Sequence, residues 1–207
     1  MKKPLSARCF IDVCDSPGKQ AILSASLGMF VRNGIDGTSI RDIATESGYT
    51  NPVLFKHFDS KDALAQTLFI NAFKWIYGNL PPLTEEKFLV QMEEILRAYL
   101  ALLDEDIEVV MFFQENLRRF WPTLSPVQRK HSLLAHMTEL INVGVRQNTF
   151  PPSNAQRLIV TGILGLLGQF AREFYFGDYG KQAANWLPHV KRLVMGMVFS
   201  LETDRGS

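Results

Sequence analysis

One stretch, residues 38–61, constrains the fold of this chain more than any other part of its 207 residues. Its first half carries three apolar side chains at helical spacing, on one face of a short helix: Ile40, Ile43 and Ala44. Gly48 follows where the chain must turn, because glycine adopts positive φ without steric cost. The second half places Leu54 and Phe58 four residues apart on another apolar face. Two short helices joined by a tight turn form a helix-turn-helix, whose second helix enters the major groove of DNA.

Hydroxyl side chains and a proline mark the ends of these helices. Thr38 is expected to cap the first helix and Thr50 the second, because a hydroxyl accepts a hydrogen bond from an unpaired backbone N–H. Pro52 falls in the first turn of the second helix, where no N–H donor is needed. Ser60 is expected to cap a third, longer helix.

Charge is distributed unevenly along a chain whose net charge is only +1. With 46% hydrophobic residues the chain is neither disordered by composition nor uniformly basic. Residues 1–61 hold eight Lys or Arg against six Asp or Glu, whereas residues 85–108 hold eight acidic residues against two basic ones. This asymmetry gives weak support for DNA at the N-terminal end, where a local basic patch is enough for phosphate contacts.

Cysteine usage and the absence of a targeting pattern favour a cytoplasmic protein. Cys9 and Cys14 are interpreted as two free thiols in a reducing compartment; a redox- or metal-responsive pair is the alternative, but no histidine or further cysteine pair lies near. Lys2 and Lys3 are not followed by the apolar run of a signal peptide. The most apolar stretch, residues 158–171, is shorter than the roughly 20 residues that span a bilayer, so no membrane partner is expected.

Helical periodicity continues through the rest of the chain and predicts an all-α fold. The expected helices cover residues 17–33, 60–77, 84–103, 107–119, 125–147, 154–176 and 181–201. We predict an N-terminal extension at residues 1–16, a helix-turn-helix DNA-binding domain at 17–61, and a helical regulatory and dimerisation domain at 62–207.

The helix expected at residues 154–176 is apolar around most of its circumference, so it must be covered on nearly all sides. Either it is the central helix of the monomer, or a second copy of the chain covers it; we favour the homodimer, because DNA readers of this kind pair to meet two half-sites. Glycines recurring every three residues allow a close approach between helices. The predicted interface is Gly162, Gly165, Leu166, Val194, Met197 and Val198.

Four short motifs at these spacings resemble one family. Residues 38–44 (TSIRDIA), 47–49 (SGY), 54–58 (LFKHF) and 60–64 (SKDAL) resemble the N-terminal domain of TetR-family (tetracycline-repressor-like) transcriptional regulators, and the resemblance extends over residues 19–70. It implies an all-α homodimer in which the first three helices bind DNA, the remaining helices bind a small ligand, and the last two helices build the dimer interface. Ligand binding would change the spacing of the two recognition helices and release the operator.

Two residues of the recognition helix depart from the family pattern. Pro52 stands where a small glycine is usual, and Phe55 lacks the phenol that often meets a phosphate. Phe55 is therefore expected to pack rather than to contact DNA. The amide of Asn51 is suited to reading adenine, and Lys56 to binding phosphate. Surface charge without a role is the alternative for the lysines, and a structural hydrogen bond for His57. The predicted DNA-contacting residues are Ser39, Arg41, Thr50, Asn51, Val53, Lys56, His57 and Lys61.

Large side chains in the helical remainder are candidates for a ligand pocket, although such residues are more often plain core. A pocket built from them would suit a mostly apolar effector. The predicted lining is Tyr99, Phe112, Phe113, Trp121, Met137, Phe170 and Phe174.

Catalysis has little support in the sequence. His131 and His136 are five residues apart and do not share a helix face as a zinc pair would. Neither a glycine-rich phosphate loop nor a hydrolase motif occurs, so no enzyme activity, cofactor or metal is predicted.

The leading hypothesis is a ligand-responsive homodimeric transcriptional regulator, a repressor, that binds a palindromic operator in double-stranded DNA and is released by an unidentified small effector. The alternatives are a TetR-like interaction protein without specific DNA recognition and a small-molecule-binding activator.

Overall fold

The computed structural model describes residues 10–12 and 14–200. Every regular element in this part of the chain is helical, which confirms the predicted all-α fold. The chain forms two compact units. The first comprises the described residues up to Gly78 together with Glu108–Leu124, and the second comprises Asn79–Ile107 and the described residues from Ser125. The functional division expected after residue 61 does not coincide with a break between these units and stays a prediction.

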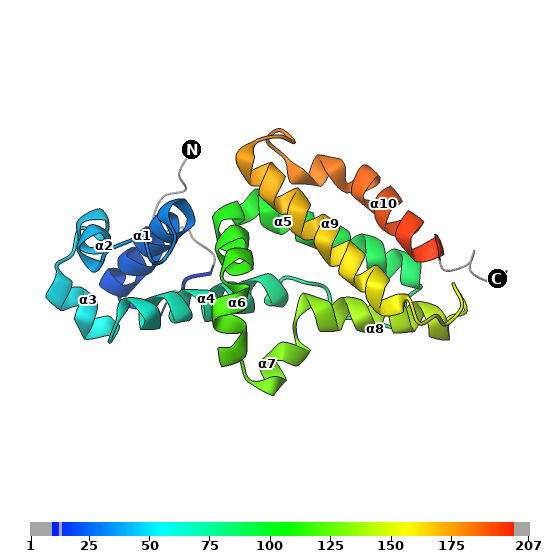
Figure 1. The fold of residues 1–207 in the computed structure, drawn as a ribbon, viewed down its shortest axis with the longest axis horizontal. Helices are drawn as coiled ribbons and strands as arrows, with labels where there is room; N and C mark the ends of the chain where they lie inside the picture. The colour runs from blue at the N-terminus through cyan, green and yellow to red at the C-terminus, as the bar shows by residue number, and fades with distance from the viewer. Residues whose placement is uncertain (1–9, 13, 201–207) are drawn as a thin grey trace. The chain divides into compact units, whose positions relative to one another are not determined.

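In the first unit, α1 (Pro17–Asn33) and α4 (Lys61–Gly78) contact the end of α5 (Phe88–Glu115), which is seen in Figure 1. Phe112 and Phe113 of α5 stack on Phe30 and Phe69, with ring centroids 6.0 and 4.9 Å apart. The helices of the first unit are α1 (Pro17–Asn33), α2 (Ile40–Ser47), α3 (Asn51–His57), α4 (Lys61–Gly78), α5 (Phe88–Glu115) from residue 108 onward, α6 (Leu117–Phe120) and the 3-10 helix η2 (Trp121–Thr123).

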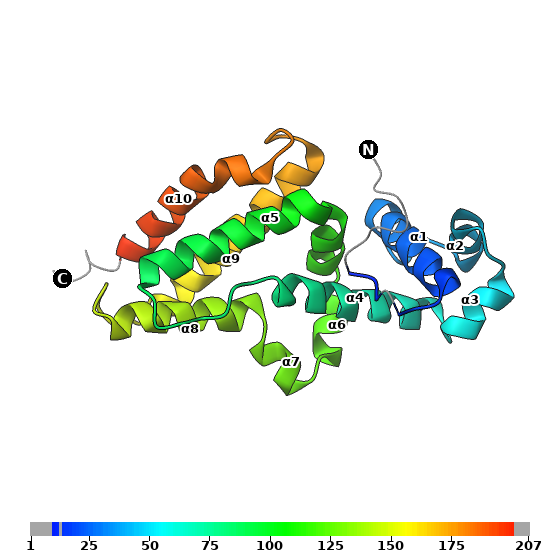
Figure 2. The ribbon, with the colours of Figure 1, turned by 180° about the vertical axis from the view of Figure 1, so that it is seen from behind.

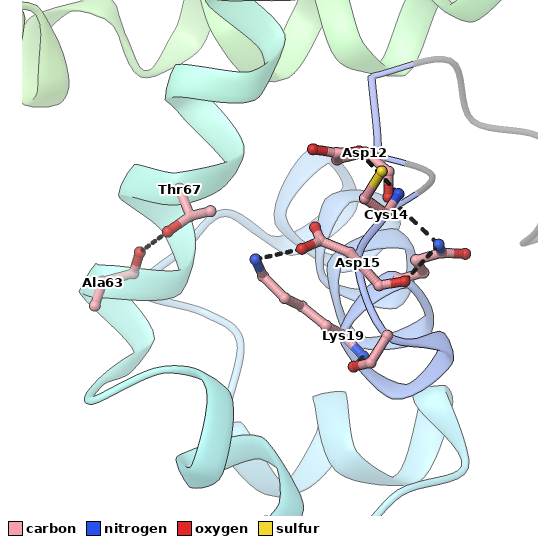
Figure 3. A network of polar contacts seen from close by, with 8 residues as sticks. Asp12, Cys14, Asp15, Lys19, Ala63 and Thr67 are labelled. Carbon is pink, nitrogen blue, oxygen red and sulfur yellow. Dashed lines mark hydrogen bonds and ion pairs between the residues drawn. The ribbon is translucent and has the colours of Figure 1, made fainter.

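Helix α1 has the bounds that the sequence predicts. Ser16 caps it by accepting from the Lys19 N–H, and Gly34 follows it with a φ of +74°. The residues just before α1 fold onto its first turn, where Lys19 donates to the Asp15 carboxylate at 2.6 Å and the Cys14 N–H donates to the Asp12 side chain (Figure 3). Cys14 is a free, exposed thiol. Cys9 lies outside the described residues.

Helix α5 is interrupted by a kink within the stretch where the sequence predicts a break, between residues 103 and 107. Asp106 has a non-helical backbone (φ −154°, ψ 85°), and the division between the two units follows just after it. The start of α5 corrects the prediction, because the helix begins at Phe88 and not near Thr84. Side chains explain the delay: the Thr84 N–H donates to Gln91 and the Phe88 N–H donates to Gln147, so these backbone groups are satisfied without helix.

The second unit places α5, α9 and α10 side by side (Figures 1 and 2). The Tyr99 hydroxyl donates to the Leu167 carbonyl at 3.1 Å, joining α5 to α9, and Lys191 pairs with Glu93, joining α10 to α5. The helices of this unit are α5 up to residue 107, α7 (Pro126–Lys130), α8 (Leu133–Arg146), α9 (Gln156–Phe176), the 3-10 helix η3 (Ala183–Trp186) and α10 (Leu187–Phe199).

Two helix bounds in the second unit differ from the predictions. The helix expected over 125–147 is broken after Lys130, because the buried Ser132 caps a new helix by accepting from the Ala135 N–H. The helix expected from residue 181 begins only at Leu187. In both cases a side-chain acceptor holds the chain outside the α conformation: the Asp104 carboxylate takes the N–H groups of the 3-10 residues 183 and 184. In the described part of the chain, no helix is long and apolar enough to cross a membrane.

Candidate nucleic-acid interface

Helix α2 begins with a capping box one residue later than the sequence predicts. The Asp42 N–H donates to the Ser39 hydroxyl at 3.1 Å, and the Ser39 N–H donates back to the Asp42 carboxylate at 3.3 Å. The hydrogen bond from the Ser39 hydroxyl holds the pKa of Asp42 below its ordinary value. Thr38 is therefore not the cap: it is buried, and its hydroxyl donates to the Gly34 carbonyl at 2.8 Å, which closes the loop between α1 and α2.

The turn between α2 and α3 follows the prediction in its backbone. Gly48 adopts the left-handed conformation with a φ of +76°, and the Tyr49 N–H donates to the Ala44 carbonyl at 3.0 Å. Thr50 occupies the position before α3, but its side chain makes no capping hydrogen bond. Pro52 lies in the first turn of α3, as expected. The expected cap of the third helix is present, because the Ala63 N–H donates to the Ser60 hydroxyl at 3.1 Å.

Helix α3 is held by one apolar face. Leu54 and Phe58 are both buried in the first unit. Asn51, Pro52 and Lys56 of the same helix are exposed. Phe55 corrects the prediction that it packs, because 51% of it remains exposed. Successive helical residues are about 100° apart around the axis, so burial of Leu54 rotates Phe55 out of the core.

The remaining predicted contact residues divide by exposure. Ser39, Arg41 and Thr50 lie exposed at the starts of α2 and α3, whereas Val53 and His57 are half-buried. Lys61 is also half-buried, and its ammonium donates to the Thr38 carbonyl at 2.8 Å. That hydrogen bond ties the first turn of α4 to the loop before α2, so Lys61 has a structural role in this conformation.

Two aromatic residues that the sequence did not assign to the interface are exposed beside it. Besides Phe55, Tyr49 is exposed in the turn, and its ring lies near Gly18 of α1, where an added Cβ would come within 3.3 Å. The exposure of Phe55 could have been predicted from the sequence, because a helical projection of α3 that directs Leu54 and Phe58 inward leaves Phe55 beside the buried face rather than in its centre. Nothing in the local pattern signals the position of Tyr49, because the contact joins residues 31 positions apart.

The helices around the helix-turn-helix match a known family. Residues 22–68 match the family described as bacterial regulatory proteins, tetR family. This stretch therefore carries the N-terminal domain of TetR-family transcriptional regulators, as the motifs at residues 38–64 predict.

Relatives of this chain extend the similarity beyond residues 22–68. The HTH-type transcriptional repressor KstR2 of Mycobacterium tuberculosis is 21% identical over 136 residues, which cover 63% of this chain and 68% of that protein. The structure of that protein, titled a ketosteroid transcriptional regulator, has a TM-score of 0.71 at 18% identity, covering 93% of this chain and 98% of the other.

Two further solved structures share the fold. A tetR-family regulatory protein from Rhodococcus RHA1 has a TM-score of 0.75 at 17% identity and covers 89% of this chain and 98% of its own. The transcriptional regulator FadR of Bacillus subtilis, solved in complex with stearoyl-CoA, has a TM-score of 0.63 at 14% identity and covers 84% and 96%.

The residues predicted to line a ligand pocket fall into both compact units. Phe112, Phe113 and Trp121 belong to the first, where the two phenylalanines are core residues. The second unit holds the others: Tyr99, Met137, Phe170 and Phe174. In that unit Phe170 stacks on Tyr179 with ring centroids 4.8 Å apart. The pocket stays a prediction.

The residues predicted for the dimer interface differ in their access to a partner. Val194 and Val198 are completely buried in the single chain, which removes them from the set. Met197 and Gly162 meet within the chain, because a Cβ added at Gly162 would come within 3.1 Å of the Met197 sulfur. Gly165 is exposed and has nothing within 4 Å of its Cβ position, whereas Leu166 is half-buried. Leu158 and Leu193, which the prediction omitted, are 71% and 56% exposed on α9 and α10.

Proposed function

We propose that this chain is a homodimeric repressor, not an enzyme, that reads a palindromic operator through α3 and leaves it when a small, mostly apolar effector binds. The observation that carries the proposal is the geometry of α3. Leu54 and Phe58 anchor the helix in the first unit, whereas Asn51 and Lys56 are exposed and free to enter a major groove.

Asn51 is the proposed reader of an adenine, because a side-chain amide forms two hydrogen bonds with the adenine edge. Arg41 and Lys56 are exposed cations suited to phosphates, which position the protein without reading sequence. Selection from random duplexes is expected to yield a palindrome with half-sites about 10 bp apart or a multiple of that.

Binding assays on that duplex and on a scrambled one separate these roles. Asn51→Ala should weaken binding to the operator by roughly 1–3 kcal/mol and leave binding to the scrambled duplex almost unchanged. Lys56→Ala, the matched control, should weaken both and lower the salt slope by about 1. An equal loss on both duplexes with Asn51→Ala would remove Asn51 as a reader. Failure to select any duplex, with dimers intact, would favour an interaction protein.

The dimer is supported by the apolar surface that α9 and α10 leave uncovered in a single chain. Leu158 and Leu193 are exposed. Gly165 of α9 has nothing within 4 Å of its Cβ position, so the backbone of another helix can approach it. Leu158→Glu and Leu193→Glu are each expected to produce monomers in sedimentation and to weaken operator binding. Val127→Glu, at an apolar residue of α7 that is equally exposed, is the matched control and should remain dimeric. Dimers that survive both α9 and α10 changes would place the interface elsewhere.

The effector is proposed to be mostly apolar because one relative is a ketosteroid regulator and another was solved in complex with stearoyl-CoA, whose long acyl chain is apolar. Stearoyl-CoA and a ketosteroid are therefore the first probes. Release of the operator by either one, measured by fluorescence anisotropy, would support the proposal. Transcription from an operator-bearing promoter then separates a repressor, which lowers transcription until the probe is added, from an activator, which raises it.

A further inference from the structure

We propose that Phe55, assisted by Pro52, reads the C5-methyl group of a thymine in each operator half-site. This inference rests on the proposed function and adds a second base reader to Asn51. It begins from the two apolar side chains that α3 exposes, Pro52 and Phe55.

The exposed surface of α3 has few groups that could read bases by hydrogen bonding. Among its exposed residues only Asn51 and Lys56 carry side-chain donors, and Asn51 alone carries a side-chain acceptor. Pro52 and Phe55 offer carbon only. One amide and one ammonium on this helix distinguish few base pairs by hydrogen bonding, which leaves the exposed apolar residues of α3 to contribute to recognition.

The major groove presents one apolar group on its base edges, the thymine methyl, and phenylalanine is among the side chains that contact it. A ring that is half-exposed in the free protein gains by covering that methyl, because apolar surface is then removed from water on both partners. Phosphates offer the ring no comparable partner, since they are charged. The chemistry of Phe55 thus selects thymine over the other three bases.

The helix also fixes where this thymine lies. Asn51 and Phe55 are four residues apart on one side of α3, so their Cβ atoms are about 6 Å apart. Base pairs rise by about 3.4 Å each. The thymine is therefore expected within about two base pairs of the adenine that Asn51 contacts.

Replacing single thymines of the selected operator by 2′-deoxyuridine tests the inference, because this change removes the methyl group and nothing else. We expect one thymine of each half-site to be sensitive, with affinity falling about fourfold for one half-site and about 15-fold for both, the effect of one buried methyl each. Phe55→Ala should bind the thymine and uracil operators equally. Lys56→Ala is the control and should keep the full thymine-to-uracil ratio while binding both more weakly.

Three results would overturn the inference or its basis. If no thymine is sensitive, Phe55 does not read a methyl group. If Phe55→Ala retains the thymine preference, another residue reads it. If no duplex is bound specifically by the unaltered protein, the proposed function itself fails, which is a different result from specific binding without a methyl effect. Thermal unfolding should show that Phe55→Ala folds normally, because the side chain is half in water already.

Discussion

Arg119 of α6 donates to the carboxylate of Asp62, in the first turn of α4, at a distance of 2.6 Å. The same guanidinium pairs with Asp36 in the loop between α1 and α2 at 3.0 Å. One cation thus joins three segments of the first unit, of which two flank the helix-turn-helix. The hydrogen bond to Asp36 is the main cause that holds the pKa of Arg119 above its ordinary value.

Loss of the ion pairs of Arg119 should increase the mobility of the loop between α1 and α2 more than it lowers the free energy of unfolding. Arg119→Ala is expected to cost at most about 1 kcal/mol, because all three side chains are at least partly exposed and water screens the charges. Amide exchange in residues 34–38 should become faster. Arg119→Lys should restore little, since an ammonium lacks the fork that spans two carboxylates. A loss of several kcal/mol in urea unfolding would show that the ion pairs stabilise the fold itself.

The capping box of α2 should contribute measurably to stability. Ser39→Ala is expected to lower the free energy of unfolding by about 1 kcal/mol, because the Asp42 N–H loses its acceptor. Thr45→Ala is the matched control on the same helix: its hydroxyl donates only to the Arg41 carbonyl within the helix, and the change should be close to neutral. Equal effects of the two changes in thermal unfolding would contradict a capping role.

Gly144 on α8 should tolerate no side chain. A Cβ at this position would come within 2.5 Å of the Phe150 ring and 3.0 Å of the Phe88 ring. Gly144→Ala is therefore expected to destabilise the protein by about 1–3 kcal/mol through overpacking. Gly196→Ala on α10 has nothing within 4 Å and should be neutral or stabilising by up to about 1 kcal/mol, because alanine favours helix. Chemical denaturation of both variants tests the contrast.

His136 should make the protein less stable in mild acid. Burial lowers the pKa of this imidazole below its ordinary 6.5, although a hydrogen bond to the Pro81 backbone partly offsets the effect. Between the lowered pKa and about 6.5 the unfolded chain binds more protons than the folded chain, so stability falls as pH drops through that range. His136→Phe should flatten the pH dependence in thermal unfolding, whereas His131→Gln, at an exposed position, should preserve it. A wild-type profile unchanged by His136→Phe would assign the acid sensitivity to other groups.

Patterns among neighbouring residues were sufficient to predict most of the backbone from α1 to the start of α4. The bounds of α1, the left-handed Gly48 and the Ser60 cap all follow from residues within a few positions of each other. Thr38 shows where such patterns stop being sufficient. Two adjacent hydroxyls both suit a cap, and only closure of the loop onto the Gly34 carbonyl makes Thr38 the buried one and Ser39 the cap.

The sequence alone determined the class of fold, the helix-turn-helix and the resemblance of residues 38–64 to the TetR family, because periodicity, caps and motif spacing are properties of neighbouring residues. The tertiary structure decided which polar groups end helices through distant partners, as Asp104 does for residues 183 and 184. It also decided which apolar side chains stay in water: Phe55 is exposed and Val198 is buried, although both are apolar residues of predicted helices. Burial depends on which neighbours the folded chain supplies, and no local pattern carries that information.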